Sequence, residues 1–326
     1  MTDRTHQGGR RGITAAAVPD LVARARDGDA RSVGRLVSLV EDESPVLRDV
    51  MAALTPYAGR ARIVGLTGAP GVGKSTSTNA LVGELRRRDL RVAVLAVDPS
   101  SPFSGGALLG DRIRMSDHVL DPGVFIRSMA ARGHLGGLSW AAPQALRVLD
   151  AAGYDVVLVE TVGVGQSEVE VAGLADSTVV LLAPGMGDGI QAAKAGILEI
   201  GDVYVVNKAD REGADKVRRD LRSMLRLAER AEGAWKPPVL KTAASTGEGV
   251  AEVVDALEEH HAFLLESGEL ERRRVRRSRE EIEAIALTAL RTRWASVGSG
   301  DRLDELAAAV VAGESDPYTA ADALLA

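Results

Sequence analysis

The sequence of 326 residues contains no cysteine. The missing thiols exclude disulfide bonds, thiolate metal ligands and cysteine nucleophiles, and they fit a reducing compartment. Long apolar runs are also missing, so we expect neither a signal peptide nor a membrane span. With a formal net charge of −6, the chain lacks the basic footprint that is usual for nucleic-acid binders. These absences predict a cytoplasmic protein that binds neither nucleic acid nor a membrane.

What is present is enough apolar sequence, 45% of the chain, to bury a large core. Residues 1–19 are polar and glycine-rich, which predicts a disordered tail. Residues 20–58 show helical spacing with Asp and Ser at capping positions, which predicts an N-terminal helical arm. We place a core domain at residues 59–266 and a C-terminal helical extension at residues 267–326.

Seven short apolar runs alternate with amphipathic segments in the core domain. Several runs are apolar at every position, which indicates strands that are buried on both faces of a mainly parallel sheet. We therefore expect an α/β fold with helices around the sheet. The runs, in chain order, are RIVGLTG, RVAVLAVD, GVFIRSMA, YDVVLVET, STVVLLAP, DVYVVNK and PVLKTAA.

A glycine-rich loop follows the first run, in the stretch GLTGAPGVGKSTSTNAL. The pattern Gly-x-x-x-x-Gly-Lys-Ser between a strand and a helix is that of a phosphate-binding loop (P-loop), whose backbone N–H groups surround phosphate oxygens. Lys74 is expected to reach the β and γ phosphates, Ser75 to ligate Mg²⁺, and Thr76 to support the α phosphate. The nucleotide-binding residues expected here are Gly68, Ala69, Pro70, Gly71, Val72, Gly73, Lys74, Ser75 and Thr76.

The base is indicated by VVNKAD, which follows the sixth run. Guanine presents two donors side by side, and the carboxylate of Asp210 can accept both, so this residue would select guanine over adenine. Lys208 would lie along the base, and Asn207 would tie the segment to the P-loop. The backbone amides in the segment LKTAASTGEG would meet the guanine O6, and the residues concerned are Ala243, Ala244 and Ser245.

Three acids are candidates for the metal site and for catalysis, because strand ends on one edge of a parallel sheet converge. Asp98 ends the second run, Asp111 lies in GGALLGDRIRM, and Glu160 ends the fourth run. The segment from Glu160 to Gly163 has the form in which an acid holds a metal-bound water and a glycine N–H touches the γ phosphate. Each acid could instead be a solvated carboxylate or a helix cap. The expected catalytic set is Lys74, Asp98, Asp111 and Glu160, and the expected metal ligands are Ser75, Asp98, Asp111 and Glu160.

Five segments in order resemble the MeaB/ArgK (methylmalonic aciduria type A) family of P-loop GTPases: GAPGVGKST, VDPSSPFSGGALLGDRIRM, ETVGVGQSE, PGMGDGIQAAKAGI and VNKAD. The resemblance covers residues 20–297, including the helical arm and the basic helix after the core. It implies a P-loop NTPase fold and a GTPase that uses GTP, GDP and Mg²⁺ and is a homodimer through its C-terminal helices. It further implies docking on an adenosylcobalamin-dependent acyl-CoA mutase, with methylmalonyl-CoA mutase as the default client. GTP hydrolysis would gate cofactor delivery and protect the mutase, and Lys194 would lie near the partner or the nucleotide.

Two features depart from these patterns. Gln166 lies three residues after Gly163 and not directly after it, which argues against the usual water-orienting role. No Asp-x-His-x-x-Gly motif occurs, so the mutase rather than this chain would hold the corrinoid.

Two other functions stay open. A nickel-delivery GTPase would need a Cys and His ligand cluster, and the adjacent His260 and His261 indicate a surface pair rather than a metal site. A protein kinase of an amino-acid transport system would need an acceptor pocket and a base that the sequence does not reveal.

The helix after the core has two notable features. Its basic run, ERRRVRRSREE, has flanking acids at helical spacing, which favours a solvated or dimer-facing helix over one that binds RNA or a membrane. An apolar stripe of Ile282, Ile285, Leu287 and Leu290 predicts a dimer contact.

Overall fold

The computed structural model describes residues 13–99, 116–118, 120–131, 141–161, 167–185, 197–227, 231–296 and 299–325. Asp111, Gly163, Gln166 and Lys194 lie outside these residues. The chain divides into two compact units, residues 1–274 and 275–326.

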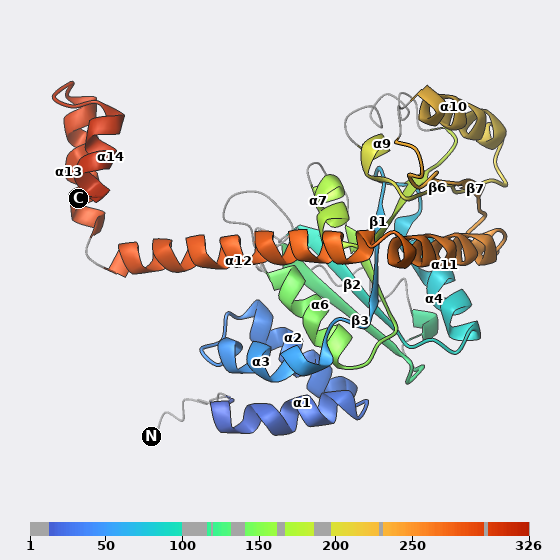
Figure 1. Ribbon diagram of the computed structural model, residues 1–326, viewed down its shortest axis with the longest axis horizontal. Coiled ribbons are helices and arrows are strands. Elements are labelled where there is room, and N and C mark those ends of the chain that lie inside the picture. Colours follow the sequence, from blue (N-terminus) through green and yellow to red (C-terminus); the bar gives the residue numbers. More distant parts are fainter. Residues whose placement is uncertain are drawn as a thin grey trace, which may run out of the picture. The chain divides into compact units, whose positions relative to one another are not determined.

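All seven predicted strands form one parallel sheet in the first unit (Figure 1), so the α/β prediction is confirmed. The strand order is β3-β2-β4-β1-β5-β6-β7, with every neighbouring pair parallel. Burial on both faces explains the uninterrupted apolar runs, since all six residues of β5 are buried. The strands are β1 (Arg62–Thr67), β2 (Val92–Pro99), β3 (Val124–Ala131), β4 (Val156–Thr161), β5 (Ser177–Leu182), β6 (Val203–Val206) and β7 (Val239–Lys241).

Alternate residues of β1 pack into different cores on the two faces of the sheet. Ile63 joins a core with α6 (Ala141–Ala151), α7 (Ser167–Leu174) and the N-terminal helices. Val64 and Leu66 join a core with α4 (Lys74–Arg87) and α11 (Val250–Glu266) on the other face. A third, smaller core lies between β5, β6, β7 and α10 (Ala214–Leu227). The short elements η3 (Ser116–His118) and α9 (Ile197–Ile200) complete this part of the unit.

The N-terminal segment folds into helices that pack on α6. Its central helix, α2, begins where Asp29 accepts a hydrogen bond from the backbone N–H of Arg31 at 3.0 Å, as an N-cap residue does. Leu36, Val37 and Val40 of α2 are fully buried, which attaches the arm to the sheet layer. The elements are η1 (Ala15–Ala17), α1 (Val18–Arg26), α2 (Ala30–Glu41), α3 (Leu47–Leu54) and η2 (Thr55–Tyr57), so the first α-helix begins two residues before the expected arm.

Buried aspartates cap the amino-terminal edge of the sheet, where backbone N–H groups lack a strand partner. Each carboxylate accepts from a backbone N–H at or next to the start of a strand. The pairs are Asp150 with Ala61 at 2.8 Å, Asp176 with Ile63 at 3.1 Å, and Asp202 with Thr178 at 2.8 Å.

Two arginines from the first turns of α12 (Glu269–Ser296) neutralise two of these aspartates. Arg273 donates to both oxygens of Asp202, at 2.9 and 3.0 Å. Arg274 donates to Asp176 at 2.8 Å. The expectation of a solvated or dimer-facing basic run is therefore wrong for these two side chains, because their hydrogen-bonded carboxylates, Asp176 and Asp202, directly precede β5 and β6.

His260 lies near Asp202 at the amino-terminal edge of the sheet and is fully buried. The expectation that it belongs to a surface pair of histidines is therefore wrong. Its Nδ1 lies 2.8 Å from the hydroxyl of Ser177 and its Nε2 lies 3.3 Å from Asp202. The ring of Trp235 covers the imidazole, with ring centroids 4.8 Å apart. Burial lowers the pKa of His260 to about 4 against the opposing charge of Asp202, so the imidazole is neutral at pH 7.

The second unit consists of the rest of α12 with α13 (Ser299–Val311) and α14 (Pro317–Leu325). Its large apolar side chains are mostly exposed, including Ile282, Ile285, Leu287 and Leu290 of α12. Among the described helices, none combines the length and apolar character that a membrane span requires.

Candidate nucleotide-binding site

The loop between β1 and α4 has a backbone that only glycine permits at two positions. Gly68 has a φ of +140° and Gly73 a φ of +95°. A Cβ at Gly68 would lie 2.3 Å from the carbonyl oxygen of Leu181, and a Cβ at Gly73 would lie 2.6 Å from Nδ2 of Asn207. Both glycines therefore allow close approach of the loop to the strands that follow, as well as its left-handed turns.

Lys74 begins α4 and is buried inside the loop that precedes it. Its ammonium donates to the carbonyl oxygen of Gly68 at 2.5 Å and lies 3.4 Å from that of Ala69. The Lys74 ammonium therefore lies in the loop that leads into the N-terminus of α4. Together they give the loop the positive potential that favours phosphate groups.

Glu160, at the end of β4, is held on both oxygens by hydroxyl groups of α4. The Ser75 hydroxyl donates to Oε1 at 2.6 Å, and the Thr78 hydroxyl donates to Oε2 at 2.9 Å. All three side chains are buried, and Glu160 is 1% exposed. The structure thus brings together Ser75 and Glu160, and it adds Thr78, which the sequence analysis missed. The spacing of three residues from Ser75, which puts both hydroxyls on one face of α4, could have revealed it.

The other candidate acids are less fully described. Asp98 is the penultimate residue of β2 and lies at the same edge of the sheet, since Ala96 lies in register with Glu160 and Val97 with Thr161. Its side chain, like all of Asp111 and Gly163, lies outside the described residues. Across the part of the chain that the structure describes, no group of three or more His, Asp or Glu residues could hold a metal ion.

Asn207 joins three loops at the carboxyl-terminal edge of the sheet. Its Nδ2 donates to the carbonyl oxygen of Val72 in the P-loop at 2.9 Å. Its Oδ1 accepts from the Thr242 hydroxyl and from the Ala244 backbone N–H, both at 3.1 Å. The side chain is 2% exposed and its contacts are fully polar, so it fixes the P-loop against the loops after β6 and β7. Thr242 was not predicted.

The residues next to Asn207 continue this arrangement. Lys208 has a left-handed backbone, with a φ of +57°, and its ammonium donates to the carbonyl oxygen of Gly71 at 2.6 Å. The backbone N–H of Ala209 donates to the carbonyl oxygen of Thr242 at 2.9 Å, which joins the loop after β6 to the loop after β7. Asp210 is exposed on the rim of these joined loops.

The loop after β7 brings the third predicted segment to the same edge. The backbone N–H groups of Thr246 and Gly247 both donate to the carbonyl oxygen of Ala243, at 2.9 and 3.0 Å, which closes a tight turn. Ala243 and Ala244 are buried, and Ser245 is exposed. The side chain of Asn207 therefore links the P-loop to the turn after β7, and Asp210 lies on the loop that carries Asn207.

Comparison with known proteins also indicates a nucleotide-binding protein. The family model described as "Methylmalonyl Co-A mutase-associated GTPase MeaB" matches residues 33–298. A protein of Pyrococcus horikoshii described as a candidate GTPase is 47% identical over 310 residues, which cover 94% of this chain and 97% of that protein. The GTPase ArgK of Escherichia coli is 39% identical over 275 residues, which cover 82% of this chain and 83% of that protein.

Two further similarities bear on function. The mouse "Methylmalonic aciduria type A homolog, mitochondrial" is 42% identical over 214 residues, 65% of this chain and 52% of that protein. A crystal structure described as "LAO/AO transport system kinase" superposes with a TM-score of 0.72 at 30% identity, covering 96% of this chain and 98% of that one. With the linked P-loop and guanine-type loops, these matches show that the chain belongs to the MeaB family and is a P-loop GTPase that binds guanine nucleotides.

Proposed function

We propose that the chain hydrolyses GTP with Mg²⁺ and thereby controls cofactor loading and protection of an adenosylcobalamin-dependent acyl-CoA mutase. The mutase proposed first is methylmalonyl-CoA mutase. The observation that carries the nucleotide part is the Asn207 side chain, which joins the P-loop to the loops after β6 and β7. The mutase part is supported by the description of the matching family and by the name of the mouse relative. The protein would act in the cytoplasm.

The P-loop residues Gly68 to Thr76 would surround the phosphates, and Lys74 would neutralise charge on the β and γ phosphates as the bond between them breaks. Water attacks the γ phosphorus, GDP leaves, and phosphate is released. Asp210 would accept the two donors of guanine, and the backbone of Ala243 to Ser245 would meet its O6.

The residues present fit a magnesium ion. The Ser75 hydroxyl donates its hydrogen bond to Glu160. The lone pairs of the Ser75 oxygen therefore remain available to a metal. Glu160, with Asp98 and Asp111, would hold the water molecules of the ion, and the N–H of Gly163 would touch the γ phosphate. Magnesium would supply charge neutralisation between the β and γ phosphates.

We also propose that the chain is a homodimer through its C-terminal extension, residues 267–326. The support is the exposed apolar stripe of α12, since Ile282 is 68% and Leu290 60% exposed. A second copy of the same stripe would cover these side chains symmetrically.

The mutase proposal is tested by affinity capture from the native organism. The purified chain is immobilised with a non-hydrolysable GTP analogue or with GDP, each with Mg²⁺, and the retained proteins are identified. We expect an acyl-CoA mutase that is retained to different extents in the two nucleotide states. Retention of no mutase in either state would contradict the client assignment.

A second candidate, a protein kinase of an amino-acid transport system, is favoured by the description of the similar crystal structure. It differs in the fate of the γ phosphate. With γ-labelled GTP and ATP as separate substrates, the GTPase proposal predicts free phosphate from GTP alone. Stable label on a protein would favour the kinase.

A further inference from the structure

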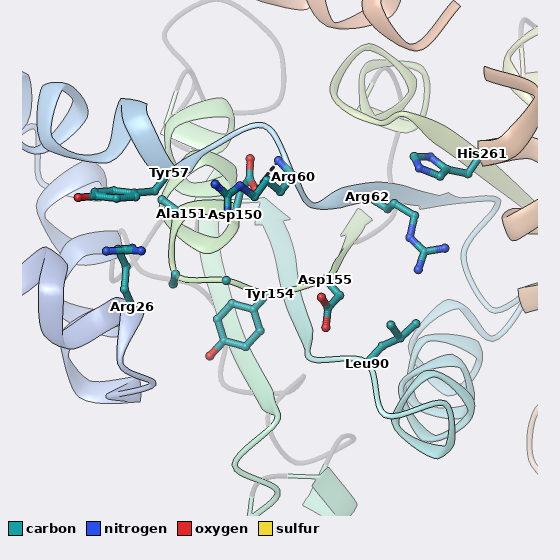
Figure 2. A pocket seen from close by; sticks show the side chains of 12 residues that line it. Arg26, Tyr57, Arg60, Arg62, Leu90, Asp150, Ala151, Tyr154, Asp155 and His261 are labelled. Carbon is teal, nitrogen blue, oxygen red and sulfur yellow. Dashed lines mark hydrogen bonds between the residues drawn. The ribbon is translucent and has the colours of Figure 1, made fainter. Parts of the chain in front are cut away.

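A cavity of about 440 Å³ lies at the amino-terminal edge of the sheet (Figure 2). Its walls come from α1 and η2 of the N-terminal arm, from the start of β1, and from the turn between α6 and β4, with Leu90 before β2 and His261 of α11. The P-loop and the loops joined by Asn207 follow the carboxyl-terminal ends of the strands, so this cavity belongs to the opposite edge. It is separate from the nucleotide site.

Three guanidinium groups line the cavity. Arg62 begins β1 and Arg60 lies two residues before it. Across the described chain neither side chain makes a hydrogen bond or an ion pair. Arg26 comes from the end of α1 and stacks on the ring of Tyr57, with its guanidinium carbon 3.6 Å from the ring centroid. Figure 2 shows Arg26 on one side of the cavity and Arg62 on the other.

The carboxylates in the same walls are occupied by backbone donors. Asp150 accepts from the backbone N–H groups of Arg60 at 3.0 Å and Ala61 at 2.8 Å. Asp155 accepts from the backbone N–H of Arg91 at 2.7 Å. These contacts use main-chain groups, so among the described residues the Arg60 and Arg62 guanidinium groups have no carboxylate partner and can donate to a ligand in the cavity.

The Arg91 side chain supports the turn between α6 and β4. The Arg91 side chain lies over the Tyr154 ring, 4.8 Å from its centroid, and donates to the carbonyl oxygens of Ala152 and Gly153 at 3.3 and 3.0 Å. Tyr154 is itself buried. These contacts order the turn without a ligand, which would lower the ordering cost of binding.

We propose that this cavity binds a phosphate-bearing small molecule. Planar guanidinium groups present paired N–H donors that match phosphate oxygens. The volume lies in the range of small-molecule sites. Such a ligand would contact Arg26 of the arm and Arg60 and Arg62 of the core together, and would fasten the arm to the sheet.

The test uses the full-length protein with a non-hydrolysable GTP analogue and Mg²⁺ in saturating amounts, so that the P-loop is filled. Inorganic phosphate and fructose 1,6-bisphosphate are then titrated by calorimetry, with succinate as the carboxylate probe. We expect saturable binding of at least one phosphate probe with a dissociation constant below about 1 mM. No saturable binding, or binding of succinate alone, would overturn the proposal.

The double variant Arg60→Gln with Arg62→Gln should weaken binding of the phosphate probe at least tenfold. The control is Arg48→Gln, which changes an exposed arginine on α3 outside the cavity and should leave the affinity unchanged. Affinity for the GTP analogue, measured on each variant, reports whether the fold is intact and should be the same throughout. Equal affinity for the probe in the double variant and the wild type would place the ligand elsewhere and refute the site.

Discussion

Thr78 donates its hydroxyl proton to Oε2 of Glu160 at 2.9 Å, from one turn further along α4 than Ser75. The Thr78 hydroxyl also lies 3.0 Å from the carbonyl oxygen of Lys74, but an ionised carboxylate is the stronger acceptor. With Ser75 on its other oxygen, the carboxylate of Glu160 is fixed in rotation. Thr78 is thereby a positioning residue for the proposed magnesium site.

Thr78→Val removes this hydroxyl at nearly constant volume. We expect the turnover number for GTP to fall at least tenfold, because a hydrogen bond to a charged group contributes about 1.5–3 kcal/mol. GDP affinity should change less than twofold. Thr78→Ser restores the hydroxyl and should restore turnover. Steady-state phosphate release and GDP titration measure both quantities, and wild-type turnover in Thr78→Val would show that Ser75 alone positions Glu160.

Lys74→Ala removes the buried cation of the P-loop. We expect GTP turnover to fall at least a hundredfold, on the scale of other losses of preorganised charge at a transition state. The far-ultraviolet circular dichroism spectrum should be unchanged. A folded Lys74→Ala protein with near-native turnover would remove this loop from the catalytic site.

The sheet was predictable because its strands are parallel and buried on both faces. Each strand is therefore an uninterrupted apolar run that can be recognised from its own sequence. The P-loop was predictable because its chemistry is local to one strand, one turn and one helix. The buried environment of His260 was not, because Trp235 and Asp202 create it from segments 25 and 58 residues away. Arg273 was misread for the same reason, since Asp202 lies 71 residues before it.

His260 makes the stability of the protein depend on pH. Its pKa is about 4 in the folded protein, whereas an imidazole in the unfolded chain has a pKa near 6.5. Between these values the unfolded state binds more protons, so the free energy of unfolding falls as the pH falls. Its contribution is fully present above about pH 6.5 and is lost by about pH 4, with a total of about 3 kcal/mol.

The measurement compares urea unfolding of the wild type and His260→Gln at several pH values between 4 and 7. Every other titratable group is present in both proteins, so only the difference between the two curves reports His260. We expect the wild type to lose more stability than the variant over this interval. Parallel curves would mean that the imidazole is not held neutral by its surroundings.

The dimer proposal predicts that charge on the stripe of α12 separates the subunits. Ile282→Glu with Leu290→Glu should yield a monomer by light scattering, because a symmetric contact would bring like charges together in an apolar setting. The control, Arg279→Glu, changes an exposed charge on the same helix and should leave the dimer intact. These substitutions leave Arg273 and Arg274 in place, so the buried Asp202 and Asp176 keep their partners. A dimer in the double variant would rule out this contact.

The substitution Asp210→Asn tests whether Asp210 binds the guanine base. The carboxylate would accept from two donors of the base, and losing this pair should weaken GTP binding at least tenfold, since each charge-assisted bond contributes about 1.5–3 kcal/mol. An amide offers one acceptor and one donor, and xanthine carries an oxygen where guanine carries its amine. The variant should therefore prefer XTP, whereas the wild-type carboxylate repels that oxygen. Both affinities are measured on both proteins at one Mg²⁺ concentration. A variant that still prefers GTP would place Asp210 outside the base site.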